Sequence, residues 1–212
     1  MRNLSILCTI LVVALASTSY GAVIGNWEGS DDGWTSPSGI LTNGQTVCVT
    51  LDNYSAGVDL SGWGQALKLQ FGAPSQKALF MQNNTFSIDF GVAASGGVYT
   101  SGYTHLQKII MNNGSAGWQQ VSGANPLITY YWWGSAGERK TTYTVDYSAY
   151  VASITDLNPD GTGPGYIEII IETQTGGGAP IRMYFDKAEL TPEPATIALL
   201  GLGGLALRRR KR

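Results

Sequence analysis

Apolar and polar residues alternate along most of the chain in short runs, and glycine, asparagine, aspartate and proline separate these runs. A period of two puts successive side chains on opposite faces and predicts a half-buried β-strand. In the run 85–92, for example, Phe86, Ile88 and Phe90 share one face. The runs with this pattern are residues 46–53, 67–72, 85–92, 105–112, 127–134, 141–148, 166–173 and 181–190.

These short strands with little helix between them predict an all-β fold. A helical period is clear only in residues 148–154, which is enough for about one or two turns. The segments between the strands are rich in glycine, as in residues 95–103, 158–165 and 175–180. We therefore expect two packed antiparallel sheets, a β-sandwich of the jelly-roll type.

The first 22 residues have a different pattern. A cationic start (Arg2) precedes an apolar core at 6–16, and small or polar residues follow it. This three-part layout is that of a secretory signal peptide. The small residues Ser19 and Gly21 favour cleavage after Gly21, and cleavage after Ala22 stays open. The sequence predicts residues 1–22 as a signal helix and export by the Sec machinery.

The last 22 residues combine three elements in a fixed order. The triplet Pro192, Glu193 and Pro194 is followed by a mainly apolar run of 13 residues at 195–207 and by the basic cluster Arg208, Arg209, Arg210, Lys211 and Arg212. A helix needs roughly 20 apolar residues to cross a bilayer, so this segment is short for a lasting span. The prolines leave extended, accessible backbone before it, and the cations favour the cytoplasmic side.

This tail resembles the sorting signal of the PEP-CTERM proteins. The resemblance covers residues 191–212 and implies cleavage near Pro-Glu-Pro by a membrane-embedded exosortase. It implies transient insertion into the inner membrane, then delivery to the envelope or extracellular matrix and association with exopolysaccharide. We expect the short C-terminal hydrophobic helix to act as an address that is read and removed.

Residues 23–190 remain as the mature domain, and their charge differs from that of the whole chain. They contain seven lysine and arginine residues and fourteen acids, a net charge of −7, whereas the complete chain has −2. No basic patch for nucleic acid or anionic lipid is therefore expected. Cys48 is the only cysteine outside the leader, so no disulfide can form within the domain.

The aromatic run of residues 130–133 is the main candidate for a ligand site. Its members are Tyr130, Tyr131, Trp132 and Trp133. On a strand, two of these side chains lie on each face, and only one face belongs to the core. The other pair could stack on sugar rings, with Tyr99, Tyr103, Trp118, Gln107, Gln119 and Gln120 as possible companions. The alternative is that all four aromatic residues fill the core.

A second resemblance appears at the ends of the domain. The segments GNWEGSDDGWTS at 25–36 and MYFDKAELT at 183–191 are similar to the first and last strands of jelly-roll carbohydrate-binding modules. This resemblance implies that the two ends lie side by side. It also implies one structural calcium ion, with Glu28 and Asp186 as carboxylate ligands.

Simple alternation along the last strand gives an independent reason to consider Asp186. It puts Asp186 on one face with Tyr184, Ala188 and Leu190, which form an apolar row. A carboxylate in such a row is costly unless it is paired or bound to a metal. An ordinary ion pair or a partly exposed strand end is the alternative.

Catalysis is the competing class of function. Glu168 and Glu172 share a strand face, and similar strands in retaining jelly-roll glucanases have three acids. The central position here is Ile170, so a main component of the acid pair is missing. His105 is the only histidine, and there is no Gly-x-Ser-x-Gly motif and no Cys/His metal spacing.

The sequence thus predicts an exported protein of the envelope or matrix with a non-catalytic carbohydrate-binding domain. Two alternatives stay open. One is a structural or adhesive matrix protein without a sugar site, and the other is a glycoside hydrolase that uses Glu168 and Glu172.

Overall fold

A computed structural model describes the protein over residues 21–37, 39–42, 54–60, 62–94, 102–123, 126–132, 139–176 and 181–192. The strand predicted at 46–53, with Cys48, lies outside the described residues, as do the signal peptide and the tail beyond Pro192. Within the described ranges, no helix is both long enough and apolar enough to cross a membrane.

Sheet A is antiparallel and has the order β10-β6-β12-β4-β3, with β1 also paired to β12. Register opposes Phe90 on β6 to Phe185 on β12, and both side chains are fully buried. The face that carries these phenylalanines is therefore the inner face. The strands of sheet A are β1 (Ala22–Gly25), β3 (Leu41–Thr42), β4 (Ala56–Leu60), β6 (Thr85–Ala94), β10 (Arg139–Asp146) and β12 (Ile181–Thr191).

Sheet B is antiparallel and has the order β2-β5-β11-β7-β8, with β9 also paired to β7. Its central strand β11 confirms the expected alternation, because Ile167, Ile169 and Ile171 all belong to the core. The strands of sheet B are β2 (Trp34–Thr35), β5 (Trp63–Phe71), β7 (Gly102–Asn113), β8 (Gly117–Gln120), β9 (Ile128–Trp132) and β11 (Ile167–Gly176).

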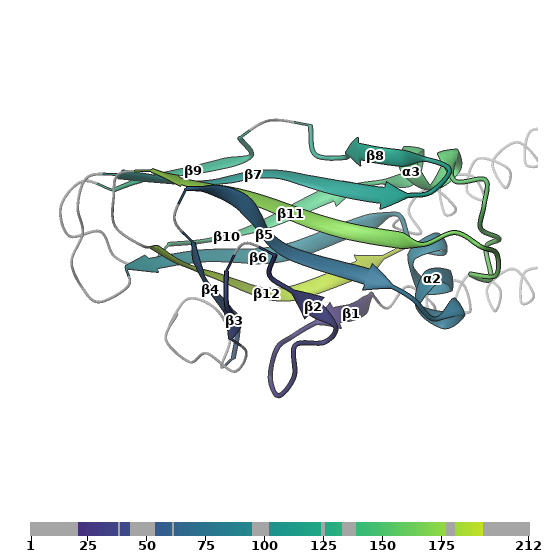
Figure 1. Ribbon diagram of the computed structural model, residues 1–212, viewed down its shortest axis with the longest axis horizontal. Helices are drawn as coiled ribbons and strands as arrows, with labels where there is room; N and C mark the ends of the chain where they lie inside the picture. Colours follow the sequence, from purple (N-terminus) through teal and green to yellow (C-terminus); the bar gives the residue numbers. More distant parts are fainter. Residues whose placement is uncertain are drawn as a thin grey trace, which may run out of the picture.

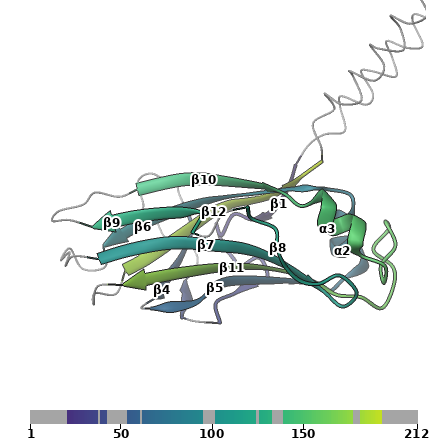
Figure 2. The ribbon, with the colours of Figure 1, turned by 90° about the horizontal axis from the view of Figure 1, so that it is seen from above.

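The chain passes repeatedly from one sheet to the other. β4, β6, β10 and β12 belong to sheet A, and the intervening β5, β7 and β11 belong to sheet B. This alternation, with the strand orders above, is the topology of a jelly roll. The predicted two-sheet antiparallel β-sandwich is thus confirmed, and Figures 1 and 2 show its strands running lengthwise.

Two short helices, α2 (Pro74–Met81) and α3 (Ser148–Ser153), lie at the same end of the sandwich in both views (Figures 1 and 2). α3 was expected from the sequence, whereas α2 was not. Proline at the start of α2 is pre-set for a helix, and the Gln76 side chain accepts the N–H groups of Gly72 and Ala73 before it. Phe80 of α2 contributes a fully buried ring to the core, which stacks on Tyr147 with ring centroids 4.6 Å apart.

The two ends of the described chain lie side by side, as the sequence predicted. β1 runs antiparallel to β12, so that Ala22 faces Leu190 and Val23 faces Glu189. β6 borders the same part of β12 on its other side, where Leu190 faces Phe86. The end of β12 is therefore held from both sides.

The face predicted for Asp186 is wrong in one respect. Asp186 lies opposite Asp89 and shares the outer face of sheet A with Tyr184. Beyond it the register shifts, and Leu190 lies opposite Phe86 on the inner face. A β-bulge with Lys187 at φ 49° causes the shift, so the apolar row assumed from simple alternation does not exist.

Candidate functional site

The side of sheet B that is turned away from sheet A has the richest set of side chains for a ligand. We refer to it as the sheet B face. It is built from β5, β11, β7 and β8, because the residues of these strands that alternate with the core residues all point to it. Its members are Trp63, Gln65, Lys68, Gln70, Tyr103, His105, Gln107, Lys108, Ile110, Asn112, Trp118, Gln120, Glu168, Ile170, Glu172 and Gln174.

Two isoleucines form the centre of the sheet B face. Ile110 on β7 and Ile170 on β11 oppose each other across the ladder. Both are fully buried, although neither belongs to the core cluster between the sheets. Lys68 lies opposite Ile170 on β5. The long side chains around this pair thus leave charged and amide groups, and not the isoleucines, in contact with solvent.

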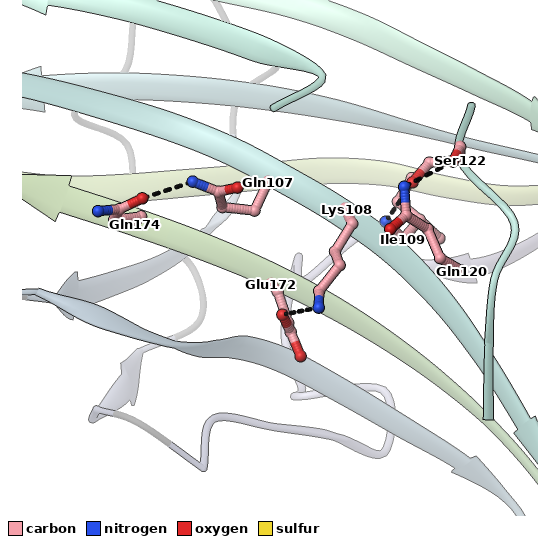
Figure 3. Close-up of polar contacts among 7 residues, drawn as sticks. All are labelled: Gln107, Lys108, Ile109, Gln120, Ser122, Glu172 and Gln174. Carbon is pink, nitrogen blue, oxygen red and sulfur yellow. Dashed lines mark hydrogen bonds and ion pairs between the residues drawn. The ribbon is translucent and has the colours of Figure 1, made fainter. Parts of the chain in front are cut away.

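Two ion pairs flank the isoleucines. Lys68 Nζ lies 2.6 Å from Glu168 Oε1, and Lys108 Nζ lies 2.9 Å from Glu172 Oε2, as Figure 3 shows for the second pair. Asn112 Nδ2 also donates to Glu168 Oε2 at 2.7 Å. Each lysine is matched by a glutamate, so the centre of the face has no net charge.

Amide and aromatic side chains are joined by hydrogen bonds towards the far end of the face. Gln107 Nε2 donates to Gln174 Oε1 at 2.6 Å, a bond between β7 and β11 that Figure 3 shows. Gln174 Nε2 in turn donates to the Tyr103 hydroxyl at 2.9 Å. Gln107 has no direct partner in the ladder, because the β7–β11 register shifts there. This bulge directs the Gln107 side chain towards Gln174.

His105 adds an imidazole ring to this network. Its Nδ1 lies 2.7 Å from Thr129 Oγ1 on β9, and its ring centroid lies 4.4 Å from that of Tyr103. Burial lowers the pKa of His105 below its ordinary value of 6.5, so the ring is neutral at pH 7. One ring nitrogen then donates a hydrogen bond and the other accepts one.

Exposed aromatic rings stand at both ends of the sheet B face. Trp63 is 71% exposed beside Gln174, and Trp118 is 49% exposed beside Asn112. Tyr166, which directly precedes β11, is 39% exposed. Trp118 lies level with Glu168, and Trp63 lies level with Gln174. Glu168 and Gln174 are six positions apart on β11, which at about 3.3 Å per residue makes the face about 20 Å long.

The structure brings several of the predicted companions together on this face. Tyr103, Trp118, Gln107 and Gln120 lie there, whereas Gln119 opposes the core residue Met111. Tyr99 lies outside the described residues. The sequence analysis missed Trp63 and Gln174, because only the pairing of β5, β11 and β7 places them beside Tyr103.

The aromatic run at 130–133 is described only in part. Tyr130, Tyr131 and Trp132 belong to β9, and Trp133 lies outside the described residues. Register opposes Tyr131 to Tyr103 and Trp132 to Gly102. β9 is thus a neighbour of the sheet B face at the level of its backbone, and the use of these four aromatic residues in binding stays a prediction.

The predicted calcium ligands occupy different surroundings. Glu28 is exposed in the turn after β1, whereas Asp186 is only 2% exposed and its Oδ1 accepts the Lys187 N–H. Among the described side chains, no three of His, Cys, Asp and Glu gather as a metal group would require. Calcium needs six to eight oxygens, so a site here would depend on backbone carbonyl groups. The calcium ion stays a prediction.

The turn after β1 is instead organised by Asp32. Its Oδ2 accepts the N–H groups of Asn26 and Trp27, at 2.9 and 3.0 Å. Burial raises the pKa of Asp32, but hydrogen bonds from Ser30 and from these two N–H groups outweigh it and hold the pKa below 3.8. The carboxylate that stabilises this turn is therefore that of Asp32, which follows Glu28 by four residues.

A pocket of about 470 Å³ lies apart from the sheet B face, between β1, β5 and α2. Its lining includes Ile24, Asp32, Phe71, Gln76 and Leu79. Pockets of this size suit small ligands. An elongated polymer is better matched by a face that several strands share.

Comparison with known proteins identifies the tail and one group of similar structures. Residues 190–212 match the model of the PEP-CTERM protein-sorting motif. This motif indicates export and a location in the envelope or at the cell surface. No curated protein sequence matches the chain.

Similar solved structures include several carbohydrate-binding modules. One, studied for mannan recognition and named TmCBM27, is 10% identical with a TM-score of 0.47, and the match covers 83% of this chain and 99% of that one. CBM27-1 of Caldicellulosiruptor saccharolyticus, solved with mannohexaose, is 12% identical with a TM-score of 0.48 over 83% and 99%. The xylan-binding CBM22-1 of Paenibacillus barcinonensis Xyn10C is 12% identical with a TM-score of 0.45 over 84% and 99%.

Proposed function

We propose that this protein is an exported, exosortase-processed component of the cell envelope or extracellular matrix whose sandwich domain binds carbohydrate on the sheet B face without catalysis. The ligand we infer is a neutral exopolysaccharide chain. The observation that carries this proposal is the combination of exposed aromatic rings and connected amide groups along one open face about 20 Å long.

The chemistry of the sheet B face suits sugar. Exposed aromatic rings, such as those of Trp63 and Trp118, are suited to stack on the apolar faces of sugar rings. Gln70 and Gln120 are exposed on this face and present amide groups, which both donate and accept hydrogen bonds, as hydroxyl groups require. Gln107 and Gln174 are buried and bonded to each other, so they hold the surface beside Trp63 in place. Because both central lysines are paired with glutamates, a neutral chain fits better than a polyanion.

The surroundings of the two acids disfavour a glycosidase. A glycosidase needs two carboxyl groups that are available to act as acid, base or nucleophile. Each glutamate here forms an ion pair with a lysine, and the buried Ile170 stands between them where similar glucanase strands have a third acid. These features support surface recognition more than acid and base catalysis.

The sorting motif supports the location and the processing. It begins at residue 190, where the last strand of the sandwich ends. Export through the Sec machinery and transient insertion of the short apolar helix complete this proposal. A matrix rich in exopolysaccharide would then be the natural source of the ligand.

A glycan array with the full chain in mild detergent tests the binding function. We expect selective binding of neutral glycans, with affinity that rises with chain length until the face is filled. Trp63→Ala and Trp118→Ala should each raise Kd at least about tenfold, which corresponds to about 1.4 kcal/mol.

Val23→Ala is the matched control for these variants, because Val23 is 56% exposed on β1, away from the sheet B face. It should bind as the wild type does, and all three variants should keep the wild-type melting temperature. A chain that binds no glycan, or tryptophan variants with unchanged affinity, would refute the proposed function and favour a structural role in the matrix.

A further inference from the structure

The sorting motif overlaps the folded domain. The match begins at residue 190, yet β12 continues to Thr191. Leu190 is fully buried and belongs to the core. The backbone oxygen of Thr191 accepts the Asn84 N–H at 3.2 Å, and Thr191 is paired with Thr85 on β6. No spacer therefore separates the last strand from Pro192.

The first strand holds the same residues from the other side. Ala22 and Val23 of β1 pair with Leu190 and Glu189. The favoured cleavage of the signal peptide after Gly21 retains both of these β1 residues. Leu190 is thus paired with β1 on one side and with β6 on the other, and Thr191 is paired with β6.

We propose that the pairing of Leu190 on both sides and of Thr191 with β6 makes Thr191 a fixed boundary for processing, so that the membrane-embedded enzyme cuts only beyond Thr191 and meets the folded domain directly at the end formed by β1 and β12. The inference rests on the proposed processing of the tail. The step breaks one peptide bond between Thr191 and Ala195. Water adds its hydroxyl group to the carbonyl carbon and a proton to the departing nitrogen, so that the domain keeps a new carboxyl group and the tail leaves with a new amino group.

The physical reason is the requirement of a protease for free, extended backbone. A cut before Thr191 would need β12 to separate from β1 and from β6 at the same time. It would also remove Leu190 and Ala188, both fully buried, from the core. Pro192 lacks an N–H group and cannot extend the ladder as a donor, so accessible backbone begins where pairing ends.

Limited proteolysis of the full chain with proteinase K, followed by intact mass, tests the boundary. In the wild type we expect cuts beyond Thr191 first, and cuts within 188–191 at least tenfold more slowly. Val23→Pro removes an N–H group and strains the pairing of β1, so it should accelerate cuts within 188–191 at least tenfold. The matched variant Val23→Ala should behave as the wild type does.

Equal cutting rates before and beyond Thr191 in the wild type would overturn the inference. Should Val23→Pro fail to fold, the mature protein from its native envelope gives a second measurement. Its mass should place the C-terminus between Thr191 and Pro194, and an earlier C-terminus would also overturn the inference. A mature protein that retains Arg208–Arg212 would instead refute the proposed processing, while the proteolysis still decides whether Thr191 is a boundary.

Discussion

At the scale of single residues, Gly161 shows how closely the loop at 158–163 rests on helix α2. Its φ is +76°, and a Cβ atom would lie 2.0 Å from the Pro74 oxygen and 2.4 Å from the Ala78 nitrogen. Lys77 of α2 also binds the end of this loop, because its buried Nζ donates hydrogen bonds to the backbone oxygens of Gly163 and Gly165 at 3.2 and 3.0 Å. The sequence marked this stretch only as a glycine-rich loop, since neither contact follows from local pattern.

We predict that Gly161→Ala lowers the free energy of unfolding by at least about 2 kcal/mol, because it combines left-handed backbone strain with a collision against backbone atoms. Gly123→Ala is the control, since nothing lies within 4 Å of its Cβ position. It should change stability by less than about 0.5 kcal/mol. Urea unfolding of both variants measures the difference. Similar midpoints for the two would show that the loop does not pack on α2 as described.

At the scale of elements, alternation predicted most strands but not their irregularities. The period of two in β6 and β11 was sufficient, because both strands have one side in the core. It failed for Ala188 and Leu190, because a bulge beyond Asp186 changes the register. A second bulge leaves Gln107 without a direct partner in the ladder, which alternation does not reveal. Bulges leave little trace in composition, so residues beyond one are assigned to the wrong face.

β9 carries a prediction of the same kind. Neighbouring residues on a strand point to opposite faces, so Trp132 and Trp133 should differ in their effects. One of Trp132→Ala and Trp133→Ala should cost about 3–5 kcal/mol of stability, and the other should weaken glycan binding at constant stability. Thermal melts and the glycan assay separate the two effects. If both variants only destabilise the protein, the aromatic run is core and the sheet B face binds without it.

At the scale of the whole molecule, the candidate site is a product of topology. Trp63 and Gln174 are more than a hundred residues apart in sequence and become neighbours only because β5 and β11 pair. Single aromatic and amide residues on different strands give no spacing that a motif could capture. The sorting motif is the opposite case, since its function lies in contiguous residues, and it was therefore readable from the sequence alone.

The calcium prediction also belongs to the whole molecule, because the ion would join the two ends of the domain. Three non-glycine residues with positive φ, namely Trp27, Asp32 and Lys187, lie in or beside the segments that carry Glu28 and Asp186. Such strain persists only where its surroundings stabilise it, and backbone carbonyl groups bound to calcium would do so. Removal of calcium with a chelator should then lower the melting temperature by about 5 °C or more.

The design of that experiment separates the two carboxylates. Calcium should restore the melting temperature and magnesium should not, because magnesium requires a smaller octahedral shell. Asp186→Asn should abolish the difference between calcium and chelator, since the buried carboxylate would be the principal anionic ligand. Glu28→Gln should reduce the difference in melting temperature between calcium and chelator if the Glu28 carboxylate binds the ion. If Asp186 and backbone oxygens alone bind the ion, Glu28→Gln should leave that difference unchanged. A melting temperature that is the same in calcium and in chelator would show the prediction to be wrong, and pairing of β1 with β12 alone would then hold the ends together.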